Sequence, residues 1–137
     1  MARKVVDYTV EAEGRDRGKV FQITEMPAAQ AERWAMRAFQ ALARAGVDLG
    51  DVMGMGMQGV AQAGLRAFAF LPFHEAEPLL AEMMSCVRAK PDRAHGNVVR
   101  ELVDEDTEEV ATRLTLRMEV LKLHTDFLRA DGPSTSA

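Results

Sequence analysis

The segment 107–128 limits the possible folds more than any other part of this chain. Its apolar spacing predicts a long helix, and at about 100° per residue it carries two apolar stripes on nearly opposite sides. The first stripe contains Val110, Ala111, Leu114, Met118, Leu121 and Leu128, and the second contains Leu116, Val120, Leu123 and Phe127. Such a helix either lies at the centre of its own domain or packs its second face on a partner. A chain of 137 residues has few layers to cover both faces, so both arrangements stay open.

Charges along this predicted helix are arranged to complement the helix dipole. The acidic side chains at its start are Glu105, Asp106, Glu108 and Glu109, and the basic side chains further along are Arg113, Arg117, Lys122 and Arg129. Acidic groups are stabilising near the first amides of a helix, and basic groups near its last carbonyls. Asp104 or Asp106 is therefore expected to cap the first turn.

The N-terminal part of the chain has the pattern of a β-hairpin. Residues 5–13 and 19–24 alternate between apolar and polar side chains, and the turn-forming residues 14–18 (GRDRG) separate them. This arrangement predicts two antiparallel strands. Because an isolated two-stranded hairpin is only marginally stable, the hairpin is expected to pack against helices.

The middle of the chain is predicted to be mainly helical. One helix is expected from Pro27, which suits a first turn, to Gly46, which ends it. Two more are expected at 60–70, where 65–70 is also compatible with a strand, and at 75–88, with Pro78 in the first turn. Loops are expected at 46–59 and 91–97, and a short strand at 98–103.

Together these elements predict an α+β fold, mostly α-helical, with an N-terminal β-hairpin and about four helices. The single domain is expected to span 1–130. Residues 131–137 contain Gly, Pro, Ser and Thr, and we expect a disordered C-terminal tail there.

The overall composition argues against two classes of partner. A net charge of −4 gives no general attraction to phosphate backbones, so no nucleic acid is expected as a partner. No run of eighteen apolar residues is present, so no membrane is expected either, and cytoplasm is the default location. The single cysteine, Cys86, lies among apolar residues and is interpreted as a small core residue.

No motif in the chain indicates a catalytic, metal or cofactor site. Residues 54–59 (GMGMQG) match the glycine spacing of dinucleotide-binding loops, but the residues before them are too broken by glycine for a buried strand. His74, His95 and His124 share no metal-ligand spacing. We therefore expect no catalytic residue, no metal and no cofactor, and interpret 54–59 as a loop.

Binding of another protein is the remaining class of function. Nine methionines are unusually many for this length, and methionine lines adaptable binding surfaces. Met53, Met55 and Met57 alternate with glycines, so they either contact a partner or tuck against the core. The candidate partner-binding residues are these three methionines and the second helical stripe, Leu116, Val120, Leu123 and Phe127.

Several longer runs resemble the tail assembly chaperones of long-tailed bacteriophages. The first comprises 18–28 (GKVFQITEMPA) and 30–35 (QAERWA). Later runs are 71–73 (LPF), 78–80 (PLL), 84–87 (MSCV), 102–106 (LVDED), 108–114 (EEVATRL) and 116–117 (LR). The resemblance spans about residues 18 to 127, and none of its runs is a catalytic signature.

The resemblance implies a non-enzymatic assembly factor. Such chaperones bind the tape measure protein, keep it soluble and help recruit tail tube proteins, act in the host cytoplasm and are absent from the mature virion. Many have a short form and a longer frameshifted form, and this chain would correspond to the short one. Two other interpretations stay open: a small nucleotide-binding enzyme that uses 54–59, and a structural tail protein that self-associates.

Overall fold

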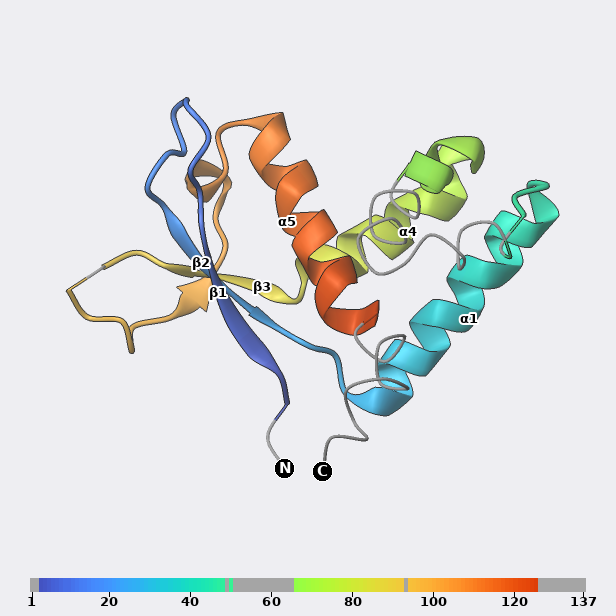
Figure 1. Cartoon of the computed structure of the whole chain (residues 1–137), viewed down its shortest axis with the longest axis horizontal. Helices are drawn as coiled ribbons and strands as arrows, with labels where there is room; N and C mark the ends of the chain where they lie inside the picture. The colour runs from blue at the N-terminus through green and yellow to red at the C-terminus, as the bar shows by residue number, and fades with distance from the viewer. Residues whose placement is uncertain (1–2, 49, 51–65, 93, 126–137) are drawn as a thin grey trace.

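The computed structural model describes residues 3–48, 50, 66–92 and 94–125. Within these residues the chain forms a small α+β domain, with a four-stranded antiparallel sheet at one end and helices at the other (Figure 1). The sheet contains β1 (Val5–Thr9), β2 (Val20–Thr24), β3 (Val87–Lys90) and β4 (Arg100–Glu101), in that spatial order. The helices are α1 (Ala28–Arg44), α4 (Phe73–Met84) and α5 (Val110–His124), with the 3-10 turns η1 (Phe68–Phe70) and η2 (Asp104–Asp106).

The hairpin prediction is confirmed, but the hairpin is one half of a larger sheet. Strands β1 and β2 pair antiparallel, with Tyr8 opposite Phe21, and β2 pairs in turn with β3, with Ile23 opposite Val87. Phe21, Ile23, Val87 and Ala89 are all buried and alternate with more exposed residues. The sheet therefore has one apolar face, which α5 covers through its contact with β2.

The first helix follows its prediction closely. Helix α1 begins directly after Pro27 and ends before Gly46, which has a φ of 88°. The Gly46 amide donates to the Ala43 carbonyl, and the Val47 amide donates to the Leu42 carbonyl at 3.0 Å. This pair of bonds is a Schellman ending, and it needs the left-handed conformation that glycine adopts without strain.

The third predicted helix is wrong at both ends. Helix α4 begins at Phe73, because the amides of Glu75 and Ala76 both donate to the Pro72 carbonyl. Pro78 consequently lies inside the helix instead of in its first turn. The helix ends at Met84, and the residues from Val87, predicted as its last turn, form β3.

The described residues contain three α-helices where about four were predicted for the whole chain. Most of the predicted helix 60–70 lies outside the described residues, and its last part is the short turn η1. The predicted strand 98–103 is present as the two residues of β4. The predicted tail 131–137 lies outside the described residues.

The start of α5 is capped from the other end of the chain. Asp16, in the turn between β1 and β2, accepts hydrogen bonds from the backbone amides of Glu108 and Glu109 at 2.9 Å. Its carboxylate also accepts a bond from Lys19 Nζ at 2.9 Å. The expected local cap by Asp104 or Asp106 is not formed, since Asp106 bonds instead to Arg100 and to the Val103 amide.

The Asp16 carboxylate stays ionised although it is buried. Burial raises the pKa of this carboxyl, but hydrogen bonds from Thr112, Lys19 and the two α5 amides outweigh it and hold the pKa well below its usual range. Next to it, Arg15 forms an ion pair with Glu109 at 3.0 Å. The turn between β1 and β2 therefore fixes where α5 lies on the sheet.

Candidate partner-binding surface

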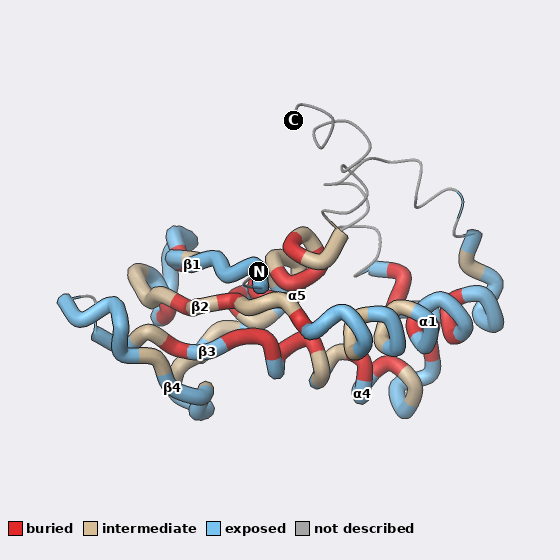
Figure 2. The backbone as a smooth tube through the Cα atoms, turned by 90° about the horizontal axis from the view of Figure 1, so that it is seen from below, coloured by how far each residue is buried: buried red, intermediate tan, exposed pale blue. Residues whose placement is uncertain are grey.

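The two stripes of α5 have different surroundings. Leu116, Val120 and Leu123, from the second stripe, are buried in the core between the sheet and the helices, and Figure 2 shows the buried stretch of α5. The first stripe is divided: Val110 and Leu114 are exposed, Met118 is half-buried and Leu121 is buried. Of the two arrangements open for this helix, the structure places the second stripe at the centre of the domain.

The exposed part of α5 is consequently not the part that the sequence suggested. Three of the candidate residues, Leu116, Val120 and Leu123, are buried and have almost no accessible surface to offer a partner. Met53, Met55, Met57 and Phe127 lie outside the described residues. Leu114, on the opposite side of α5, is 48% exposed. A partner that contacts α5 would therefore meet it on that side.

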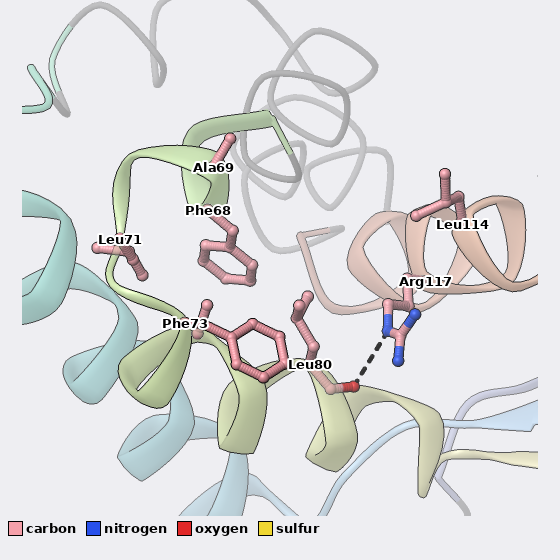
Figure 3. A pocket seen from close by; sticks show the side chains of 8 residues that line it. Phe68, Ala69, Leu71, Phe73, Leu80, Leu114 and Arg117 are labelled. Atoms are coloured by element: carbon pink, nitrogen blue, oxygen red, sulfur yellow. Dashed lines mark hydrogen bonds between the residues drawn. The ribbon is translucent and has the colours of Figure 1, made fainter. Parts of the chain in front are cut away.

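A hollow lies on this side of the molecule, between η1, α4 and α5 (Figure 3). Its volume is about 310 Å³, similar to the smaller ligand pockets of proteins. Within the described part of the chain, seven apolar side chains and one arginine line it: Phe68, Ala69, Leu71, Phe73, Ala76, Leu80, Leu114 and Arg117. We call this hollow the aromatic groove.

The rim of the groove exposes large apolar side chains to water. Phe73, the first residue of α4, lines the groove and is 71% exposed. Phe70, the last residue of η1, is 70% exposed but is not among the residues that line the groove. Leu114 continues this apolar rim on α5. Scattered exposed apolar residues are ordinary, but several gathered around one hollow are typical of a binding surface.

The floor of the groove is held by contacts of its own. Phe68 is buried and its ring lies 6.1 Å, centroid to centroid, from the ring of Trp34. Trp34 Nε1 donates a hydrogen bond to the Leu79 carbonyl at 3.0 Å, which joins α1 to α4. These contacts hold Phe68 and α4 against α1. On the side of α5, Arg117 Nε donates a hydrogen bond to the Leu80 carbonyl at 3.2 Å, which joins α5 to α4.

Phe73 and Arg117 were not among the candidates predicted from the sequence. Phe73 is the first residue of α4 and directly follows Pro72. Because proline is common at the start of a helix, Pro72 was the only sequence signal for this exposed first turn. Arg117 was interpreted only as part of the charge pattern. Its position between the two stripes of one helix did not reveal which neighbour it would face.

Cys86 is the single cysteine of this chain. Burial, with a smaller effect of the negative charge of Glu82, raises the pKa of the Cys86 thiol to about 11. Cys86 is also buried in the core, where it packs as a small apolar residue. Among the residues that the structure describes, no group of three or more His, Cys, Asp or Glu is placed to hold a metal ion. The glycine-rich segment 54–59 lies outside the described residues.

Searches with protein-family models, among curated proteins and among solved structures found no match to this chain. In the described part of the chain, no helix combines the length and the apolar character needed to cross a membrane.

Proposed function

We propose that this chain is a tail assembly chaperone like those of long-tailed bacteriophages. In this role it acts without catalysis, in the host cytoplasm. It binds the tape measure protein, keeps it soluble, and helps to recruit tail tube proteins. It leaves before the mature virion is complete.

The observation that carries the proposal is the apolar rim around the aromatic groove. Phe73 of α4 and Leu114 of α5 both line the hollow, and both side chains are exposed. A factor that holds a long, aggregation-prone helical protein needs such a surface, since the apolar face of an amphipathic helix packs into an apolar groove. The choice of the tape measure protein as partner rests on the resemblance of residues 18 to 127 to tail assembly chaperones.

Co-expression tests this proposal. With the tape measure protein of the same phage as the partner, the soluble fraction of that protein should rise several-fold, and a tag on this chain should retain it. Purified virions should lack this chain. An unchanged soluble fraction together with no retained complex would rule the function out, and so would a stoichiometric amount of the chain in virions.

A further inference from the structure

Among the described residues that line the aromatic groove, Arg117 has the one polar side chain. Its Nε donates a hydrogen bond to the Leu80 carbonyl. Within the described residues, this side chain forms no other hydrogen bond or ion pair. Its terminal guanidinium nitrogens are the part of arginine that binds carboxylates in a two-pronged manner. They lie at the side of an apolar hollow, on the wall that α5 provides (Figure 3).

The surroundings of Arg117 are short of negative charge. Arg113 lies one turn earlier on α5, and its Nη1 donates to Thr107 Oγ1 at 2.9 Å. Two like charges four residues apart on a helix repel each other. No carboxylate forms an ion pair or hydrogen bond with Arg117 within the described residues. Burial, and after it the charge of Arg113, lowers the pKa of Arg117.

An incoming carboxylate would therefore relieve a repulsion that the folded chain leaves in place. We propose that the aromatic groove binds an acidic amphipathic segment of another protein. An apolar side chain of that segment enters the hollow beside Phe68 and Phe73, and a carboxylate about one turn away pairs with Arg117. The inference rests on the proposed function, because it specifies the chemistry of the segments that the chaperone holds.

A second copy of this chain fits the groove less well than an acidic partner. The acidic run near the start of α5 is the obvious candidate for self-binding, but two of its carboxylates are already paired. Asp106 is paired with Arg100 at 2.7 Å, and Glu109 is paired with Arg15 at 3.0 Å. The run also forms η2 and the residues before α5 instead of an amphipathic helix, so in the folded chain it does not offer a carboxylate beside an apolar helical stripe.

The probes for this inference are two synthetic peptides of about 18 residues, long enough to span several helical turns. Both carry the same Leu and Phe stripe. One has glutamates and the other has lysines at the remaining positions, and neither contains tryptophan. Trp34 is the single tryptophan of this chain and contacts Phe68, so its fluorescence reports on the groove. Calorimetry gives an independent affinity.

We expect the full-length chain to bind the acidic peptide at least about tenfold more tightly than the basic one, and added salt to weaken this preference. Arg117→Gln should remove most of the preference. Arg88→Gln is the matched control, because Arg88 pairs with Glu101 in the sheet, away from the groove. Since Arg117 also bonds to Leu80, urea denaturation must show that Arg117→Gln is folded.

Leu114→Glu provides a second variant that does not depend on Arg117. It places a charge on the rim at an already exposed position, and it should weaken binding of the acidic peptide by about tenfold or more. Val98→Glu is its control, since Val98 is 46% exposed and Leu114 is 48% exposed. Val98 does not line the groove.

Equal affinity for the two peptides, or an unchanged preference in folded Arg117→Gln, would overturn the inference. A concentration-dependent dimer that Leu114→Glu dissociates would also overturn it, in favour of a second copy. If wild type and Arg117→Gln retain the tape measure protein equally, the proposed function holds and this inference fails. If neither wild type nor Arg117→Gln retains the tape measure protein, but wild type still prefers the acidic peptide, the proposed function fails and this inference holds.

Discussion

Replacing Asp16 by alanine should lower the free energy of unfolding by about 3 kcal/mol, as expected for a buried charged cap that leaves its partners unpaired. The amides of Glu108 and Glu109 would lose their acceptor, and Lys19 would lose its carboxylate. The side chain of Asp16 is 1% exposed, so water cannot simply replace it. Urea denaturation followed by circular dichroism measures this loss.

The control for Asp16→Ala is Asp104→Ala. Asp104 is also acidic and lies near the start of α5, but it is exposed, so its removal should change the stability by less than about 0.5 kcal/mol. Asp16 and Glu108 are 92 residues apart in the sequence. Equal effects of the two substitutions would show that this long-range cap does not hold α5 in place.

The same carboxylate predicts a pH dependence. Because its pKa is depressed in the folded state, its contribution to stability is fully present above the pKa of the unfolded chain, about 4. This contribution is lost as the pH falls further. Wild type should therefore lose more stability than Asp16→Asn below about pH 4, and the difference between them should be constant from pH 5 to about 7. Parallel curves at all pH values would contradict an ionised, buried Asp16.

Leu116→Ala should have the largest effect of any truncation on α5, about 3 kcal/mol, because a fully buried leucine leaves a cavity when it is shortened. Leu114→Ala, the same change two residues away, should cost less than about 1 kcal/mol since its side chain is half exposed. Urea midpoints of the two variants measure the difference. If Leu114→Ala were the more destabilising of the two, α5 would have to face the sheet with its other stripe.

The strongest local patterns of the sequence predicted the elements that the structure contains. The alternation at 5–13 and 19–24 identified β1 and β2, and Pro27 and Gly46 identified both ends of α1, because each of these signals acts within a few residues. Helix α5 was also predicted, although its start is three residues later than expected. The general α+β class followed from these elements.

Interactions between distant segments could not be predicted in the same way. Strand β3 has only four residues and follows a helix directly, so its alternation is too short to compete with the helical pattern before it. It forms because Phe21 and Ile23 of β2 offer it a buried partner. Asp16 looks like an ordinary turn residue, and nothing nearby in the sequence indicates that it caps α5.

Which side of α5 is exposed could not be predicted for a related reason. Both stripes of the helix are apolar, so their spacing alone cannot tell which one the sheet covers. The decision depends on where the turn around Asp16 and the contact with β2 hold the helix. Once these are known, Leu116 belongs to the core and Leu114 to the rim of the aromatic groove.

In the proposed function, this chain works by holding another protein at the aromatic groove. Retention of co-expressed tape measure protein on tagged wild type, Leu114→Glu and Val98→Glu tests this most directly. We expect full retention by wild type and Val98→Glu, and a loss of about tenfold or more in Leu114→Glu. Equal retention by Leu114→Glu and Val98→Glu, with both variants folded, would contradict binding at the groove.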